Sequence, residues 1–251
     1  MIPPFSLPGD DRGLLLGDGL FETMLVLDGD LPHLSAHLDR MAAGCALLGL
    51  PFDRAEAERI AHEAAPVGGR FAIRLTLTAG SGGRGLDRPA APVPVLFAKA
   101  APLAVVTTPA TAIVASTRRN EGSPASRLKT LSYLDNVLAR AEATAAGADE
   151  AVMLNNRGEV ACAAAANLFW IKDDRLFTPR LDCGVLAGVT RARLLARHQV
   201  EEVAAGVEAL EIADTIFLTN SLIGVREVSR LGDQEFAPHP LTEDLRSTLQ
   251  L

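Results

Sequence analysis

Lysine is scarce in this sequence, so few residues could take part in covalent chemistry that needs a side-chain amine. The chain of 251 residues has 21 arginines and three lysines, Lys99, Lys129 and Lys172. A lysine amine can form a Schiff base with a carbonyl group. Lys172 falls in a predicted polar hairpin turn and Lys99 ends a predicted strand, whereas Lys129 directly precedes an amphipathic helical pattern in SRLKTLSYLDNVLAR. Taken alone, Lys129 is typical of a surface cation, so a role as nucleophile needs further signals.

The segment GEVACAAAANLFW, residues 158–170, is the first of those signals. It has the pattern of a hydrophobic strand after a turn, yet four alanines follow Cys162 before Asn167. Small residues in a strand indicate that a backbone or a ligand approaches closely.

The second signal is DCGVLAGVTRARLLAR, which runs from a glycine-containing loop into a predicted helix. The first turn of a helix has backbone N–H groups without intrahelical partners, and with the Thr190 hydroxyl they suit a phosphate group. The alternative is a helix capped by Thr190 without any ligand. A lysine, a small-residue strand and such a helix start are together the components of a pyridoxal phosphate site.

One apparent nucleotide motif does not fit its required context. Residues 80–85, GSGGRG, match the G-x-G-x-x-G pattern and follow a predicted strand. A dinucleotide site also needs a helix that begins at the motif, but the continuation LDRPAAP does not favour one. We therefore predict a loop here.

Composition excludes several functional classes. The chain is 48% hydrophobic and 22% charged with a net charge of −7, and it lacks the clustered basic residues that bind nucleic acid. No apolar run approaches the length of a membrane helix and the start resembles no leader, so we expect no membrane association and a cytoplasmic location. The three cysteines, Cys45, Cys162 and Cys183, suggest neither a disulfide framework nor a metal site.

Periodicity predicts two α+β domains, residues 1–104 and 105–251, with a linker in the Pro- and Ala-rich segment 101–109. Hydrophobic spacing predicts helices over 35–48, 54–64 and 131–146, and another from Thr190. Alternation predicts strands that include 71–78, 111–117, 150–154 and 215–220. Hairpins are expected at Asp28–Asp30, at 172–175 and at the end of the chain.

Six segments in this order resemble the class IV aminotransferase family: GDGLFETM, LSAHLDRM, SRLKTLSYLDNVLA, ADEAVMLNNRGEV, ANLFWIKDDRLFTP and GVLAGVTRARLL. The resemblance spans about residues 13 to 230. It implies an α/β (α+β) protein with the two-domain, D-amino acid aminotransferase-like architecture of fold type IV enzymes. It further implies a homodimer, a small amino-acid-like substrate, and pyridoxal 5'-phosphate held between the domains.

The same resemblance implies roles for individual residues. Lys129 matches the Schiff-base lysine, and Asn167 matches the family's Asn-x-Phe, where it is as much structural as catalytic. The remaining matches are contacts to the cofactor phosphate, from Arg40, Val189, Thr190 and Ser221. Without the family, Arg40 would be interpreted as an arginine on a helix surface.

Cys162 departs from the family pattern. The family has a Glu at this position, which pairs with the nitrogen of the cofactor ring. Glu159 is three residues away, and an odd offset points to the other face of a strand, so it is no substitute. A neutral thiol is a weak partner for a protonated ring nitrogen.

Three functions remain open. The first is a 4-amino-4-deoxychorismate lyase, which is favoured by the segments NSLIGVREV, LSAHLDRM and ANLFW. Because formation of an aromatic product helps to drive its elimination, this reaction tolerates a weaker partner for the ring nitrogen. The second is an aminotransferase for branched-chain or D-amino acids, although the paired threonines expected of D-amino acid enzymes are absent. The third is a cofactor-binding protein with little turnover, in which Cys162 marks relaxed catalysis.

Overall fold

The computed structural model describes residues 6–83 and 85–249 and divides into two compact units. The first unit comprises the chain up to Ala104 together with Lys129–Ser132, and the second comprises Val105–Leu128 and the chain from Tyr133 onward. The reactive lysine candidate therefore belongs to the first unit, although the chain on both sides of Lys129–Ser132 belongs to the second.

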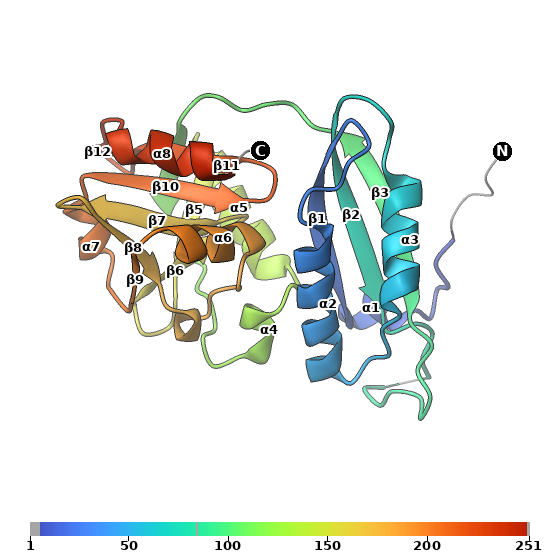
Figure 1. Cartoon of the computed structure of the whole chain (residues 1–251). Helices are drawn as coiled ribbons and strands as arrows, with labels where there is room; N and C mark the ends of the chain where they lie inside the picture. The colour runs from blue at the N-terminus through green and yellow to red at the C-terminus, as the bar shows by residue number, and fades with distance from the viewer. Residues whose placement is uncertain (1–5, 84, 250–251) are drawn as a thin grey trace. The chain divides into compact units, whose positions relative to one another are not determined.

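The first unit is a three-stranded antiparallel sheet with helices packed on it (Figure 1). Its elements in chain order are α1 (Arg12–Leu16), β1 (Gly19–Leu27), α2 (Leu34–Leu48), α3 (Arg54–Ala64), β2 (Arg70–Thr78) and β3 (Val95–Pro102). Helix α2 packs against β1, and α3 packs against β2 and β3. Asp53 caps α3 by accepting a hydrogen bond from the Glu56 N–H, and α2 ends at Gly49 in a left-handed conformation. Both predicted helices are confirmed.

The hairpin expected at Asp28–Asp30 is present only in its smallest form. The turn forms, but Leu27 and Asp30 make only one isolated bridge, and the chain enters α2 soon afterwards. The Asp28 carboxylate accepts a hydrogen bond from the Gly69 N–H at 2.7 Å, which ties the turn to the start of β2. The antiparallel partner of β1 is therefore β2.

The second unit is built on a nine-stranded mixed sheet in the order β6-β5-β4-β11-β10-β7-β8-β9, with β12 paired to β11. Its strands are β4 (Ala110–Val114), β5 (Glu150–Leu154), β6 (Val160–Ala163), β7 (Asn167–Lys172), β8 (Arg175–Pro179), β9 (Val200–Val203), β10 (Thr215–Asn220), β11 (Gly224–Leu231) and β12 (Gln234–Glu235). Its α-helices are α4 (Pro124–Arg127), α5 (Leu134–Ala145), α6 (Val189–Arg197), α7 (Glu208–Glu211) and α8 (Pro240–Leu249).

This sheet curls, so that β6 at one edge lies beside the segment that follows β9, the strand at the other edge. The Val160 N–H donates to the Ala205 carbonyl at 2.8 Å, and Glu159 forms a bridge with Gly206. Separate apolar clusters fix the helices to the sheet. In one of them, stacked rings of Phe169 and Phe217, 5.1 Å apart, meet leucines of α6 and α8.

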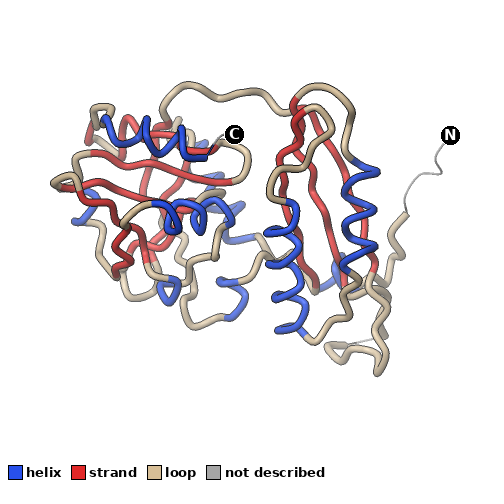
Figure 2. The backbone as a smooth tube through the Cα atoms, in the orientation of Figure 1, coloured by secondary structure: helices blue, strands red, loops and turns tan. Residues whose placement is uncertain are grey.

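Two expectations for loops and chain end have different outcomes. The described part of residues 79–94 contains no helix and is drawn as loop in Figure 2, which confirms the predicted loop at GSGGRG. The last hairpin forms as β11 and β12, but α8 follows it and was missed. In the described residues, no helix has the length and apolar character needed to cross a membrane.

Candidate active site

Lys129 is held by the edge of the first unit's sheet. The Phe21 N–H donates to the Lys129 carbonyl at 2.9 Å, and the Leu131 N–H donates to the Gly19 carbonyl at 3.0 Å. Leu20 and Thr130 form the bridge between these hydrogen bonds. Lys129 is thus positioned by backbone pairing with β1, before α5 begins at Leu134.

The side chain of Lys129 lies against an aromatic ring that also carries an arginine. Its Nζ is 4.3 Å from the centroid of the Phe21 ring, and the Arg74 guanidinium carbon is 3.5 Å from the same centroid. Both are cation–π contacts. Arg74 was missed by sequence reasoning; the available signal was its place as an exposed charge among the polar positions of β2, which alternate with apolar ones. Together the two cations suit a substrate that carries carboxylates.

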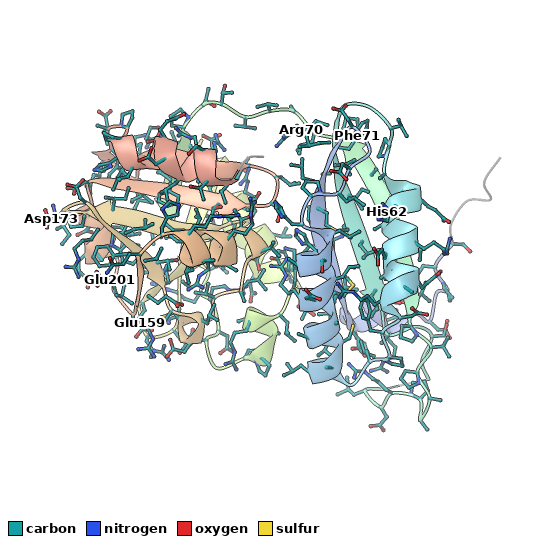
Figure 3. All side chains as sticks on the ribbon, viewed as in Figure 1. His62, Arg70, Phe71, Glu159, Asp173 and Glu201 are labelled. Atoms are coloured by element: carbon teal, nitrogen blue, oxygen red, sulfur yellow. The ribbon has the colours of Figure 1, made fainter. Side chains whose placement is uncertain are left out.

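The other two lysines lie on β3 and in the β7–β8 hairpin. Lys99 is exposed on β3, where it pairs in register with Arg74 of β2. Lys172 is ion-paired with Asp214 at 3.0 Å in the β7–β8 hairpin, where its neighbour Asp173 lies at the outer end (Figure 3). The predicted solvated turn at Lys172 is confirmed.

Arg40 lies on α2 and faces a buried carboxylate. Its Nε donates to Glu22 Oε1 at 2.7 Å and one terminal nitrogen donates to Oε2 at 2.5 Å. His37, one turn earlier, meets the same carboxylate through Nδ1 at 2.7 Å. Burial alone would raise the pKa of Glu22, but the hydrogen bonds from Arg40 and His37 outweigh it and hold the pKa below the ordinary value. Arg40 is therefore an oriented side chain, and not the surface arginine of the alternative interpretation.

In the second unit, Asn167 ties together three segments of chain. Its amide nitrogen donates to the Leu186 carbonyl at 2.9 Å, and it is paired in register with Thr219 on β10. Its amide oxygen lies only 1.9 Å from where a Cβ on Gly188 would stand. The small-residue strand end, the loop before α6 and the end of β10 therefore meet at this one side chain.

Ser221 follows directly on that meeting point. Asn220 donates from its amide nitrogen to the Ala165 carbonyl at 3.0 Å, and its amide oxygen accepts from the N–H groups of Leu222 and Ile223. These hydrogen bonds fix the turn that carries Ser221 beside the alanine segment.

Helix α6 begins beside Asn167 without a side-chain cap. Its N-cap residue is Gly188, and Val189 and Thr190 are buried in its first turn. The alternative in which Thr190 caps the helix is therefore wrong. Opposite Asn167, the Thr219 hydroxyl is buried and has no hydrogen-bond partner among the residues that the structure describes. Uncapped N–H groups and an orphaned hydroxyl fit an anionic group such as phosphate.

Cys162 lies opposite Met153 at an irregularity between β5 and β6, among small residues that include Ala161 and Ala164. Burial raises the pKa of its thiol, with Arg119 acting to lower it and Glu150 to raise it. Cys162 is consequently a neutral thiol at neutral pH. Glu159 accepts hydrogen bonds from Asn155 and Arg157 at 2.7 and 2.9 Å, so its carboxylate is engaged in the preceding turn.

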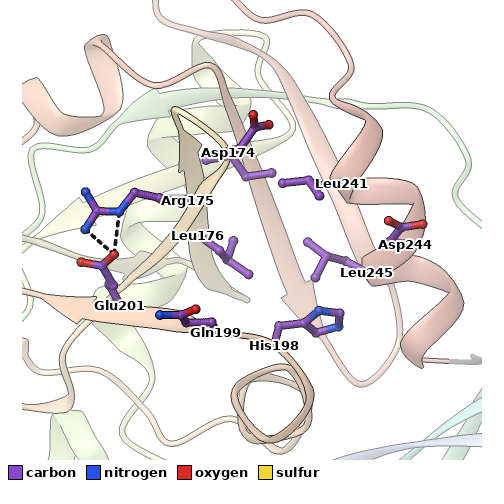
Figure 4. A pocket seen from close by; sticks show the side chains of 10 residues that line it. Asp174, Arg175, Leu176, His198, Gln199, Glu201, Leu241, Asp244 and Leu245 are labelled. Atoms are coloured by element: carbon purple, nitrogen blue, oxygen red, sulfur yellow. Dashed lines mark hydrogen bonds and ion pairs between the residues drawn. The ribbon is translucent and has the colours of Figure 1, made fainter.

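A separate cavity of about 300 Å³ lies at the opposite end of α6 from Gly188, between β8, β9 and α8. Leu176 and Leu245 line its apolar part and the Arg175–Glu201 ion pair borders it (Figure 4). None of the residues predicted for the site lines this cavity, and the described residues include no cluster suited to a metal ion.

Comparisons with known proteins agree with this architecture. The family model for "Amino-transferase class IV" matches residues 19–231. An aminodeoxychorismate lyase of Vibrio harveyi is 31% identical, covering 93% of this chain and 90% of that protein. A putative branched-chain-amino-acid aminotransferase of Methanocaldococcus jannaschii is 33% identical, covering 84% and 77%.

Solved structures share the fold. The crystal structure of a putative 4-amino-4-deoxychorismate lyase from Legionella pneumophila aligns with a TM-score of 0.92 and 31% identity, covering 99% of this chain and 96% of that one. This match confirms the predicted mixed α/β fold of the fold type IV enzymes. The chain belongs to the class IV aminotransferase family.

Proposed function

We propose that this protein is a pyridoxal 5'-phosphate-dependent 4-amino-4-deoxychorismate lyase, which eliminates pyruvate to give 4-aminobenzoate. The observation that carries the proposal is the buried, neutral Cys162 in the place where the family has a Glu. Formation of an aromatic product helps to drive this elimination, so it depends less on a charged partner for the ring nitrogen. The similarity to lyases over nearly the whole chain supports the same choice.

The residues present fit the cofactor. The uncapped start of α6, packed closely against Asn167 at Gly188, and the orphaned Thr219 hydroxyl suit its phosphate. The alanines after Cys162 leave room for a flat ring. When bound, the cofactor supplies an electron sink for a bond at the substrate Cα.

Each side chain then has a defined task. Lys129 would hold the cofactor carbonyl carbon through its amine, and the amine, once displaced by the amino group of the substrate, would be free to take the proton from the substrate Cα. Val189, Thr190, Ser221 and Arg40 would hold the phosphate. Asn167 positions the start of α6 through the Leu186 carbonyl. Arg74, on the ring that Lys129 also contacts, attracts a substrate carboxylate.

We propose a homodimer, with α5 as part of the contact surface. Leu134, Val137 and Leu138 share one side of this helix and are 67%, 58% and 48% exposed. A contiguous exposed apolar patch of this kind marks an interaction surface. The three buried cysteines, all free thiols, suit the reducing cytoplasm that we propose as its location.

An aminotransferase is the second candidate, because a branched-chain and a D-alanine aminotransferase are also among its relatives. The experiment is to incubate the purified protein and pyridoxal phosphate with aminodeoxychorismate and, separately, with L- and D-amino acids plus 2-oxoglutarate. Release of 4-aminobenzoate and pyruvate is expected. Amino transfer without 4-aminobenzoate would establish the second candidate, and cofactor binding without either product would indicate the protein of little turnover.

A further inference from the structure

Arg119 is a buried cation without a carboxylate partner. Its residue is 8% exposed, and its guanidinium donates to the Asn136 amide oxygen at 3.0 Å, to the Ser126 carbonyl at 2.5 Å and to the Gly184 carbonyl at 3.4 Å. All three acceptors are neutral, and no ion pair of Arg119 occurs within residues 6–83 and 85–249. Buried charges are ordinarily paired, so this arrangement leaves a positive field in a medium of low dielectric constant.

That field reaches the small-residue segment. The Arg119 N–H donates to the Leu154 carbonyl at 2.9 Å, which places its backbone beside the end of β5, the strand that pairs with Cys162. Asn136, which accepts from Arg119, donates in turn to the Ala164 carbonyl at 2.8 Å. Arg119 and Glu150 are the charged groups whose fields act on Cys162.

Glu150 does not cancel the charge of Arg119. Its carboxylate pairs with Arg140 at 3.0 Å and also accepts from the Ala151 N–H at 3.0 Å. Its negative charge is therefore already compensated, and Arg119 remains the uncompensated charge beside Cys162.

We propose that Arg119 is the positioning residue that makes the electrostatic potential at position 162 positive, so that a ring nitrogen placed against Cys162 stays unprotonated. The statement about the ring rests on the proposed cofactor, whereas the statement about the potential at position 162 does not. A protonated nitrogen would be a second cation in the field of Arg119, so its proton is released to solvent. With a carboxylate at position 162, the same arginine would have a counter-ion and the ring nitrogen could keep its proton.

The potential at position 162 is tested on the full chain without cofactor. Cys162→Glu and Cys162→Gln place similar volumes there, one charged and one neutral, in the wild-type and Arg119→Gln backgrounds. With Arg119 present, we expect Cys162→Glu to melt at pH 7 at least about 3 °C above Cys162→Gln. In the Arg119→Gln background the order should reverse, because the carboxylate loses its counter-ion. An equal difference in both backgrounds would overturn the proposal.

A second measurement covers the case in which Arg119→Gln does not fold. ¹³C NMR of Cys162→Glu, labelled at glutamate, follows the titration of the introduced carboxyl. A pKa below that of an exposed Glu supports pairing with Arg119, and a raised pKa contradicts it.

The ring nitrogen is tested with ¹⁵N-labelled pyridoxal phosphate in the wild type and in Cys162→Glu. We expect the unprotonated chemical shift in the first and the protonated shift in the second. A protonated wild-type nitrogen would overturn the statement about the ring. Failure to bind the cofactor at all would refute the proposed function, while the melting experiment would still decide the role of Arg119.

Discussion

The carboxylate of Glu22 holds the guanidinium of Arg40 by two hydrogen bonds, from Nε at 2.7 Å and from a terminal nitrogen at 2.5 Å. The carboxylate is almost completely buried, whereas the Arg40 side chain keeps 18% of its surface exposed. A two-point contact of this kind fixes the plane of the guanidinium as well as its position. Arg40 is consequently presented in one orientation to any anion that it binds.

Arg40→Ala should weaken the binding of pyridoxal phosphate by about 1.5–3 kcal/mol, because a charge-assisted contact to the phosphate is lost. The dissociation constant is measured from the absorbance of the bound cofactor. Arg54→Ala is the matched control, since Arg54 pairs with the exposed Asp39 on the same unit and should leave the constant unchanged. Equal constants for both variants would show that Arg40 does not contact the phosphate.

The same pair predicts how stability depends on pH. The pKa of Glu22 is lower in the folded protein than its ordinary value of 4.5, so ionised Glu22 stabilises the fold above about pH 4.5. This contribution is lost as the pH falls through the lower folded pKa. Arg40→Ala removes one cause of the lowering, so the variant should lose less of its melting temperature on acidification than the wild type does. Parallel melting curves between pH 7 and 3 would contradict the pairing.

Lys129→Ala should abolish the absorbance of the Schiff base, because Lys129 is the lysine at the position of the family's Schiff-base residue. Borohydride reduction of the wild type, followed by peptide mass spectrometry, should find the cofactor on Lys129. Lys99→Ala and Lys172→Ala serve as controls that retain the absorbance. A label on either of those lysines would refute the assignment.

Gly188→Ala should displace Asn167, because the added Cβ would stand 1.9 Å from the amide oxygen of that residue. We expect a loss of about 1–3 kcal/mol in stability from overpacking, with weaker cofactor binding because the start of α6 moves. Gly122→Ala is the control, since its Cβ would meet nothing closer than 3.4 Å. Calorimetry and cofactor titration compare the two, and similar values for both would remove Gly188 from the phosphate cradle.

Cys162→Glu should quicken amino transfer more than elimination. The carboxylate supplies a charge-assisted bond to the ring nitrogen worth about 1.5–3 kcal/mol, or one to two orders of magnitude in rate if it acts in the transition state. Elimination gains less because it draws on aromatisation of the substrate. Stopped-flow absorbance with an amino acid and, in parallel, 4-aminobenzoate formation measure both reactions. Equal acceleration of the two would refute this account of Cys162.

Local patterns in the sequence were enough for elements whose contacts lie close along the chain. Helix α3 was predicted with its observed bounds, since Asp53 marks its start and the spacing of its alanines marks its buried side. Helix α8 was missed, because the end of the chain was interpreted as a hairpin alone. Its leucines, Leu241, Leu245 and Leu249, recur at helical spacing and would have predicted it.

Other features depend on pairings that no local pattern encodes. The contact of Arg74 with Phe21 requires the register of β1 on β2. The pair of Glu22 and Arg40 requires α2 to pack on β1. The charge of Arg119 is uncompensated because the fold surrounds its guanidinium with neutral acceptors. The spacing of residues along the chain cannot predict such an environment.

The membership of Lys129–Ser132 in the first unit limits how this protein could be taken apart or recombined. A cut after Ala104 would leave Gly19–Phe21 without the segment that hydrogen-bonds to it. The other fragment would carry Lys129 without the backbone partners that hold it in place. The two units are thus not modules that recombination can exchange freely. A new first unit would have to supply both a backbone N–H donor and a carbonyl acceptor for residues 129–132.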